Sequence, residues 1–261
     1  MTRAADERPA IVTGASSGIG AATARVLAQA GHPVVLGARR LDRCEELAEK
    51  IRADGQQAHA LPLDIADPRS ADTFTREARR LVGDVDIIVS NAGRTQPGRA
   101  VNASTEQFQQ HLDVNVLGAQ ALMRAFAPTM VQRAHGDIVF VTSEVVQEPR
   151  PGVAAYVTSK WAVEGLAHAM QMEMDGTGVR VSIVRPGPTM TEMGWDWDPT
   201  VTHKLITEWQ RWGLARHSNF LPPEGVAGAV LAVVSAPADV HFRLIEVEPV
   251  APVASGEEPT S

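Results

Sequence analysis

The sequence predicts an α/β fold in which a mostly parallel, doubly wound sheet of seven strands carries helices on both faces. Three observations lead to this prediction. Short runs of apolar and β-branched residues recur along the 261-residue chain, amphipathic helical patterns lie between them, and a glycine-rich string occupies the first junction of strand and helix. Because strands buried on both faces read as continuous apolar runs, the alternation indicates consecutive βαβ units.

The expected elements follow one another regularly. The apolar runs predict strands at 10–13, 34–38, 58–63, 86–90, 137–142, 179–184 and 242–247. The helical patterns predict helices at about 17–31, 41–54, 68–82, 104–134, 153–175 and 223–235. These crossovers are long enough to hold helices and are expected to be right-handed. No internal repeat divides the chain, so we expect one domain over residues 1–261 with a core over about 9–249.

The stretch from 186 to 223 interrupts the alternation. It is far longer than the ~4–6 residues of a typical connection, and it contains Trp195, Trp197, Trp209 and Trp212, which are four of the five tryptophans. We expect residues 188–222, here called the lid, to form a mobile cover over a substrate, although fixed packing of the tryptophans is an equal alternative. Polar composition predicts flexible tails at 1–8 and 251–261.

Composition excludes several classes of protein. Lys and Arg number 24 against 31 Asp and Glu, and the net charge of −7 argues against nucleic acid as a partner. Cys44 is the only cysteine, and the eight histidines show no ligand spacing, so we assign no metal. No segment reaches the ~18 apolar residues of a membrane span, and the first residues are charged rather than apolar. We therefore expect a cytoplasmic protein that binds a small molecule, with neither nucleic acid nor membrane as a partner.

A glycine-rich string follows the first expected strand. It reads Thr-Gly-Ala-Ser-Ser-Gly-Ile-Gly over residues 13–20. Glycines at 14, 18 and 20 permit a tight turn, close approach of backbone amides to a pyrophosphate, and close packing of helix on strand. An ordinary strand-to-helix turn is the alternative that a lone glycine string leaves open, but the position at the first βα junction favours a dinucleotide site.

The end of the second expected strand bears on which dinucleotide binds. An acidic residue is expected there if the ribose 2′-hydroxyl of NAD is bound. The sequence instead has Arg39 and Arg40, whose guanidinium groups match the oxygens of a 2′-phosphate. A solvated start of the next helix is the alternative explanation. We predict that NADP(H) is preferred over NAD(H).

Further motifs appear downstream in a fixed order. They are Asn91-Ala92-Gly93, Asn115, Ser143, the Tyr156–Lys160 pair, Pro186-Gly187 and Thr191. With the glycine string, this order resembles the short-chain dehydrogenase/reductase family over about residues 9–247. The resemblance implies a Rossmann-like fold, a nicotinamide dinucleotide cofactor and a catalytic set of Asn115, Ser143, Tyr156 and Lys160.

Tyr156 and Lys160 also stand out on physical grounds. Tyr156 is the only tyrosine, and a lysine four residues later lies on the same face of a helix. A phenol titrates at a pKa of ~10, and a nearby ammonium is expected to lower it. The resemblance implies that Tyr156 transfers the hydroxyl proton, Lys160 tunes it and holds the nicotinamide ribose, and Ser143 hydrogen-bonds the substrate oxygen. Asn115 is implied to retain a water that relays protons to Lys160.

The resemblance assigns the remaining site residues. Implied cofactor contacts are Gly14, Ser16, Ser17, Gly18, Ile19, Gly20, Arg39, Arg40, Asp64, Ile65, Asn91, Ala92, Gly93, Tyr156, Lys160, Pro186, Gly187, Thr189 and Thr191. Candidate substrate contacts are Glu144, Met193, Trp195 and Trp197. Asp64 is also a candidate cap for the helix that begins near Pro68, and Glu144 has the alternative of pointing to solvent.

These residues predict an oxidoreductase. The expected reaction transfers a hydride between NADP(H) and the carbonyl or secondary alcohol of a bulky apolar substrate. The alternatives are a dinucleotide-binding sensor or scaffold without turnover, and an isomerase or dehydratase built on the same site. The apolar faces of the two longest expected helices, together with the resemblance, predict a homodimer or homotetramer.

Overall fold

A single sheet organises the chain in the computed structural model, which describes residues 7–253. Its strands are β1 (Ala10–Thr13), β2 (Val34–Ala38), β3 (Ala58–Pro62), β4 (Ile87–Ser90), β5 (Gly136–Val141), β6 (Val179–Pro186) and β7 (Leu244–Val247). Their order is β3-β2-β1-β4-β5-β6-β7, and every neighbouring pair is parallel. The predicted seven-stranded parallel sheet is therefore confirmed.

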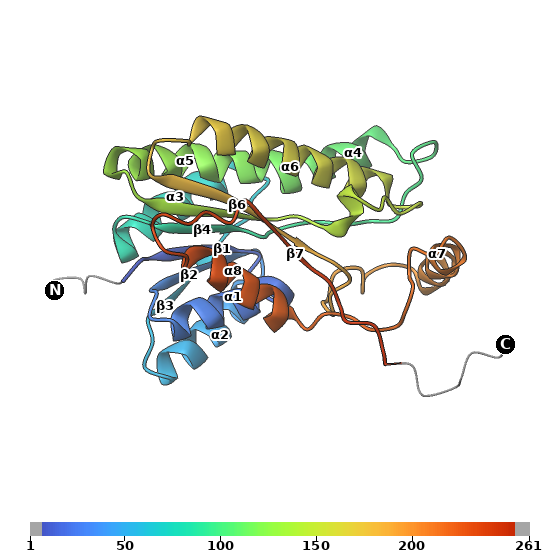
Figure 1. The fold of residues 1–261 in the computed structure, drawn as a ribbon, viewed down its shortest axis with the longest axis horizontal. Coiled ribbons are helices and arrows are strands. Elements are labelled where there is room, and N and C mark those ends of the chain that lie inside the picture. The colour runs from blue at the N-terminus through green and yellow to red at the C-terminus, as the bar shows by residue number, and fades with distance from the viewer. Residues whose placement is uncertain (1–6, 254–261) are drawn as a thin grey trace.

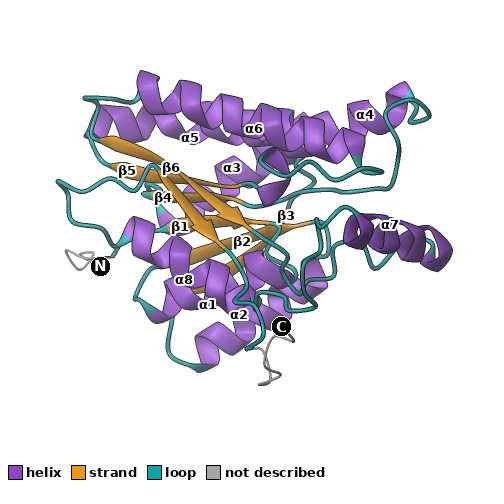
Figure 2. Ribbon diagram, turned by 45° about the vertical axis from the view of Figure 1, so that its right-hand side comes forward, coloured by secondary structure: helices purple, strands orange, loops and turns teal. Residues whose placement is uncertain are grey.

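Helices cover both faces of the sheet (Figures 1 and 2). One layer holds α1 (Gly18–Gln29), α2 (Leu41–Ala53) and α8 (Pro223–Val234). The opposite layer holds α3 (Pro68–Val82), α4 (Thr105–Leu112), α5 (Gly118–Arg133) and α6 (Ala154–Glu173). The arrangement is doubly wound because β2 and β3 extend the sheet on one side of β1, and β4 to β7 extend it on the other.

The core has two halves, one on each face of the sheet. Alternate strand residues point to opposite faces, so Ala10 and Val12 pack beneath α1, α2 and α8, whereas Ile11 packs against the other layer. The largest fully buried side chains include Phe74, Phe126 and Phe140, all in this second half. Both halves of the core include buried side chains from the strands, which the sequence predicts as apolar runs.

One expected helix is divided. The sequence predicts a continuous helix over 104–134, but α4 is followed by a π-helical turn, η1 (Asp113–Leu117), before α5 begins. Asn115 lies in this turn, and its side chain hydrogen-bonds the backbone of Arg94 rather than facing solvent. The wider π turn fits that contact, and such turns are frequent at functional sites. The other expected helices and strands differ from the observed bounds by at most two residues.

The lid contains a helix of its own, α7 (Pro199–Arg211), which lies beyond the sheet edge in Figures 1 and 2. The expected tails at 1–8 and 251–261 lie mostly outside the described residues. Within them, Arg8 donates a hydrogen bond to the Val234 carbonyl at 2.7 Å and forms an ion pair with buried Asp137. Across residues 7–253 no helix combines the length and apolar character needed to cross a membrane.

Candidate active site

A cavity of about 1040 Å³ opens at the carboxyl ends of the strands. Its walls come from the glycine-rich turn, the ends of β2, β4, β5 and β6, the start of α6, and the lid. In open parallel sheets this edge, next to the point where the strand order reverses between β1 and β4, is where ligands bind. All of the predicted site residues line the cavity except Gly20 and Asn115.

The glycine-rich turn is shaped by close backbone packing. Gly14 has φ +67°, and a Cβ there would lie 2.9 Å from the Ala92 Cα. A Cβ on Gly20 would meet the Gly14 carbonyl and the Asn91 amide, so Gly20 allows helix to pack on strand and does not face the cavity. Ser17 precedes α1 without capping it through its side chain, which leaves the first-turn amides available to an anionic ligand.

Asn91 joins β4 to β1 beneath the cavity. Its side-chain amide donates to the Thr13 carbonyl at 2.9 Å, and the backbone amides of Asn91 and Ala92 each donate to the Thr13 hydroxyl at 3.0 Å. Asn91, Ala92 and Gly93 line the cavity as predicted. Thr13 opens the glycine-rich string, but the sequence did not show that its hydroxyl accepts from the two residues after β4, because that contact joins positions 78 and 79 residues apart.

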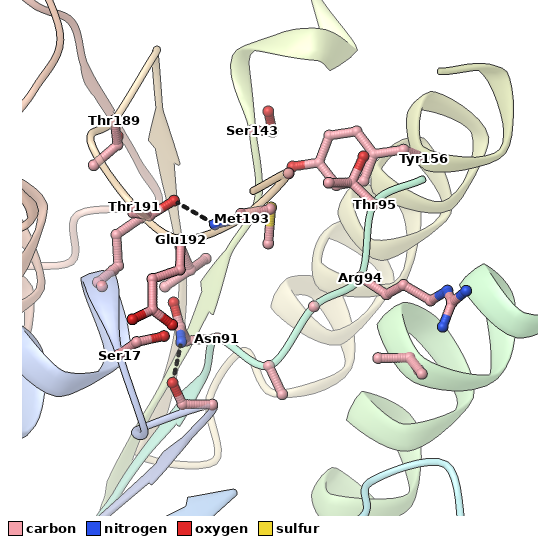
Figure 3. A pocket seen from close by; sticks show the side chains of 18 of the residues that line it. Ser17, Asn91, Arg94, Thr95, Ser143, Tyr156, Thr189, Thr191, Glu192 and Met193 are labelled. Atoms are coloured by element: carbon pink, nitrogen blue, oxygen red, sulfur yellow. Dashed lines mark hydrogen bonds between the residues drawn. The ribbon is translucent and has the colours of Figure 1, made fainter. Parts of the chain in front are cut away.

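Ser143, Tyr156 and Lys160 meet on one wall. Ser143 follows β5 and begins a short 3₁₀ turn, η2 (Glu144–Val146), while Tyr156 and Lys160 lie one helical turn apart on α6. Figure 3 shows the Tyr156 hydroxyl and the Ser143 side chain on the same side of the pocket. The Lys160 ammonium donates to the Val141 carbonyl at 3.0 Å and lies 5.8 Å from the centre of the Tyr156 ring.

Burial is the largest influence on the pKa values of Tyr156 and Lys160. It raises the pKa of Tyr156 above its ordinary value, and a hydrogen bond with Ser143 is the main opposing influence. Burial also lowers the pKa of Lys160 to about 8, against the attraction of the Glu164 carboxylate. The pKa of Tyr156 is thus raised rather than lowered as expected from the sequence, because burial outweighs the other influences on the phenol.

Asn115 lies behind this wall. Its side-chain oxygen accepts from the Arg94 amide at 2.7 Å, and its amide donates to the Arg94 carbonyl at 3.0 Å and to the Ser159 hydroxyl at 2.8 Å. It is buried, and it ties the loop after β4 to the helix that carries Tyr156 and Lys160. Its contacts thus position the loop and the helix relative to each other.

Two arginines surround one carboxylate beside the glycine-rich turn. Arg40 donates to Glu192 at 2.7 Å and to the hydroxyls of Ser16 and Ser17 at 3.0 and 2.8 Å. Arg43 donates to the same carboxylate at 2.6 and 2.8 Å. The sequence predicts a role for Arg40 but not for Arg43 or Glu192, although Arg43 follows Arg40 by only three residues.

Arg39 differs from its neighbour. It lines the cavity, is exposed, and its guanidinium has no hydrogen-bond or ion-pair partner among residues 7–253. Asp64 and Ile65 line the cavity as well. The helix cap near Pro68 is Asp67, whose carboxylate accepts from the Arg69 amide at 2.9 Å, so Asp64 does not cap α3.

The final strand-to-lid junction borders the same cavity. Pro186, Gly187, Thr189 and Thr191 all line it. The Thr191 hydroxyl accepts from the Met193 amide at 3.3 Å, and the Thr189 hydroxyl donates to the Gly187 carbonyl at 2.9 Å. Both hydroxyls therefore make local hydrogen bonds at the base of the lid, and Figure 3 shows the Thr191 contact as a dashed line.

Glu144 faces the cavity rather than bulk solvent. It forms an ion pair with Arg150, and burial raises its pKa to about 7. The Arg150 guanidinium lies 5.3 Å from the Trp209 ring, and the Trp209 indole donates to the Pro151 carbonyl at 2.8 Å. A charged pair thus connects the residue after Ser143 to the lid helix α7.

Other lid side chains close the outer end of the cavity. Met193, Trp195, Trp197 and Trp209 line it, and the Trp197 indole donates to the Thr95 carbonyl at 3.3 Å. Trp195 is 73% exposed. Trp212 does not line the cavity and stacks near Arg211, with 5.9 Å between the guanidinium and the ring centre.

The cavity and its donors fit a nicotinamide dinucleotide. Uncapped amides of α1, the hydroxyls of Ser16 and Ser17, and the guanidinium groups of Arg40 and Arg43 form an anion-binding end. The opposite end holds Ser143, Tyr156 and Lys160. The two ends belong to one continuous space, as an extended ligand with a phosphate-rich half requires.

Comparison with known proteins agrees with this geometry. The family model for the short chain dehydrogenase matches residues 8–202. The chain is 34% identical over 241 residues to the glycine betaine reductase ATRR of Emericella nidulans, covering 92% of this chain but only 18% of that longer protein. It is 32% identical over 234 residues to the 2,3-dihydro-2,3-dihydroxybenzoate dehydrogenase of Bacillus subtilis, covering 87% and 88% of the two chains.

Solved structures show the same architecture. An alcohol dehydrogenase from the archaeon Thermococcus sibiricus, complexed with 5-hydroxy-NADP, matches with a TM-score of 0.81 and 30% identity over 96% of this chain and all of that one. The closed form of a serine dehydrogenase complexed with NADP+ matches with a TM-score of 0.82 and 28% identity over 97% and 99% of the two chains. The chain belongs to the short-chain dehydrogenase family and is an NAD(P)-dependent oxidoreductase.

Proposed function

We propose that the protein interconverts a carbonyl compound and a secondary alcohol with NADP(H) as the preferred cofactor, acting on a bulky apolar substrate. The observation that carries this proposal is that Ser143, Tyr156 and Lys160 share one cavity with the glycine-rich turn. The nicotinamide ring supplies or accepts the hydride when it is bound. The remaining steps fall to side chains of this chain.

Tyr156 would transfer the proton. In the reducing direction its hydroxyl donates a proton to the substrate oxygen, and in the oxidising direction its phenolate removes one. Ser143 would hydrogen-bond the same oxygen and stabilise the negative charge that develops there. The proximity of both hydroxyls, which Figure 3 displays, supports this division of roles. Lys160, whose pKa is about 8, would supply positive charge near the ring while it is protonated.

Cofactor preference rests on the anion-binding end of the cavity. No carboxylate from the end of β2 is present to bind a ribose 2′-hydroxyl, and Arg39, Arg40 and Arg43 offer guanidinium groups instead. The structures of the Thermococcus alcohol dehydrogenase and of the serine dehydrogenase, which are complexes with 5-hydroxy-NADP and NADP+, support the same preference.

The bulky apolar substrate is supported by the outer cavity wall. Met193, Trp197 and Trp209 present apolar surface there, next to Ser143 and Tyr156 in the same cavity. The Glu144–Arg150 ion pair makes one side of this wall polar. A substrate with a large apolar body and one polar group beyond its reacting oxygen fits both features.

Turnover tests the proposal. Absorbance decay of NADPH is measured with a panel of aromatic, terpenoid, steroid and fatty ketones and aldehydes, and formation of NADPH is measured with the matching secondary alcohols. The proposal expects turnover with members of this panel and a lower kcat/KM when NADPH is replaced by NADH. Binding of NADPH without turnover of any compound in either direction would contradict it.

A further inference from the structure

Two arginine side chains bind the carboxylate of Glu192 at the edge of the cavity. Arg40 and Arg43 contact it directly, and Arg40 also holds the hydroxyls of Ser16 and Ser17. Both carboxylate oxygens accept from Arg43, and one also accepts from Arg40. Planar guanidinium groups that converge on one anion also suit a phosphate group.

The location of this position connects two parts of the cavity. Arg40 and Arg43 belong to the end of β2 and the start of α2, where the adenosine side of a bound dinucleotide lies in doubly wound folds. Glu192 belongs to the lid, between Thr191 and Met193, and Figure 3 shows its side chain directed toward Ser17. The base of the lid is therefore held by the residues that an adenosine 2′-phosphate would use.

We propose that Glu192 sets cofactor selectivity by competing with the 2′-phosphate of NADP(H) for Arg40 and Arg43. The proposal rests on the cofactor preference proposed above. Binding of the phosphate displaces the Glu192 carboxylate, and NADH, which lacks that phosphate, leaves the ion pairs in place. NADP(H) binding therefore releases the base of the lid, whereas NAD(H) binding does not.

Local geometry lets the released segment move. Gly194 follows two residues later with φ +90°, in a region that side chains rarely adopt, so the chain there is suited to a change of direction. Met193 and Trp195, which line the substrate end, flank this glycine. The Glu192 ion pairs thus hold one end of the segment 193–195, which borders the proposed substrate end of the cavity.

Electrostatics keep the competition active near neutral pH. Arg40 and Arg43 hold the pKa of Glu192 below its ordinary range, so the side chain stays ionised at neutral pH. The ion pairs are only partly buried, with the Glu192 side chain 31% exposed. Salt therefore weakens both the ion pairs and the phosphate contact, and binding is to be measured at one fixed ionic strength.

The decisive experiment compares Glu192→Gln with a matched control, Glu208→Gln. Glu208 also lies in the lid and pairs with an arginine outside it, Arg99 of the loop between β4 and α4, but it lines no part of the cavity and does not contact Arg40 or Arg43. Dissociation constants for NADPH and NADH are measured by fluorescence titration, and those for adenosine 2′,5′-bisphosphate and AMP by calorimetry. Adenosine 2′,5′-bisphosphate and AMP differ only in the 2′-phosphate and lack the nicotinamide, so their comparison measures the 2′-phosphate contact alone.

In Glu192→Gln the competing charge is removed, and the dissociation constants of NADPH and adenosine 2′,5′-bisphosphate are expected to fall by about 5-fold. This is the size of effect that the loss of two partly exposed ion pairs implies. Binding of NADH and AMP should change by less than about 2-fold, and Glu208→Gln should change none of the four by more than that. An equal effect of Glu192→Gln on phosphorylated and unphosphorylated ligands, or no effect on either, would overturn the inference.

The outcomes also separate the inference from the proposed cofactor preference. If the unaltered protein binds NADPH and NADH equally but Glu192→Gln favours NADPH, the proposed preference is wrong and the competition is supported. If neither protein favours NADPH, both are wrong. A preference for NADPH that Glu192→Gln leaves unchanged contradicts the competition alone.

Discussion

Tyr156 lies among groups that move its pKa in opposite directions. Burial and the carboxylate of Glu144 raise the pKa, while a hydrogen bond with Ser143 and the charge of Arg150 lower it. Glu144 itself has a pKa of about 7, so it acquires its full negative charge only above that pH. The residue after Ser143 is therefore placed to adjust proton transfer.

We predict that Glu144→Gln shifts the pH profile of alcohol oxidation to lower pH. Oxidation requires the phenolate, which is present above the Tyr156 pKa, and removing the Glu144 charge lowers that pKa. The measurement is kcat/KM for alcohol oxidation as a function of pH. Glu148→Gln serves as the control, because Glu148 acts on Glu144 but not on Tyr156. An unchanged midpoint, or one at higher pH, contradicts the prediction.

Some site residues can be predicted from the sequence and others cannot. The lone tyrosine four residues before a lysine identified Tyr156 and Lys160, because helical spacing alone puts them on one face. Glu192 could not be identified in this way, since its contact with Arg40 joins positions 152 residues apart. Arg150 was missed for a similar reason, because its role depends on Glu144 and on Trp209 of the lid.

The π-helical turn η1 is the element that most affects the site. It presents Asn115 to the backbone of Arg94 and to Ser159 on α6. A hydrophobic pattern of period 3.6 cannot register one extra residue in a single turn, so the sequence predicted one continuous helix. The strands were predicted more closely, because apolar runs between glycine and polar residues mark their ends.

We predict that Asn115→Ala lowers the free energy of unfolding by about 1–3 kcal/mol, since it leaves the amide and carbonyl of Arg94 without their partners. Urea unfolding followed by circular dichroism measures this change. Asn102→Ala, at an exposed position, is the control and should change the free energy by less than about 0.5 kcal/mol. Equal stability of Asn115→Ala and the unaltered protein would show that these hydrogen bonds do not stabilise the loop.

A buried charge network stabilises the same helix from its other side. Glu164, one turn after Lys160, accepts from the Thr142 hydroxyl at 2.8 Å and from Arg185 at 2.9 and 2.7 Å. These contacts join α6 to β6 and to the residue that follows β5, next to Ser143. The sequence shows the helix position of Glu164 but not its partners, which come from two strands brought together by the sheet.

At the scale of the whole molecule, the sheet places two chemically different ends of one cavity along its carboxyl edge. The reversal of strand order between β1 and β4 opens the space, and the lid covers the end that holds Ser143 and Tyr156. The alternation of apolar runs and helices was sufficient to predict this architecture. The position of the lid was not predictable in detail, because it depends on side-chain contacts such as the Trp209 indole with the Pro151 carbonyl.

We predict a homodimer or homotetramer assembled through the helix layer of α4, α5 and α6. Trp161 on α6 is 56% exposed and Leu117 of η1 is 54% exposed, so this layer carries apolar surface outward. Light scattering should give a multiple of the chain mass, and Trp161→Glu should lower it. Trp212→Glu, at a similarly exposed tryptophan on the lid, should leave the mass unchanged. A monomer mass at all concentrations contradicts the prediction.

The central claim is that Tyr156 transfers the proton, and the variant Tyr156→Phe tests it most directly. The control is Thr158→Val, at an exposed position of the same helix. Both variants are assayed for NADPH oxidation with a ketone that the unaltered protein reduces, and for NADPH binding by fluorescence. The account predicts that Tyr156→Phe binds NADPH as the unaltered protein does but loses at least about 100-fold in kcat, the low end of what a positioned general acid contributes. A Tyr156→Phe variant that binds NADPH and retains the kcat of the Thr158→Val control would contradict it.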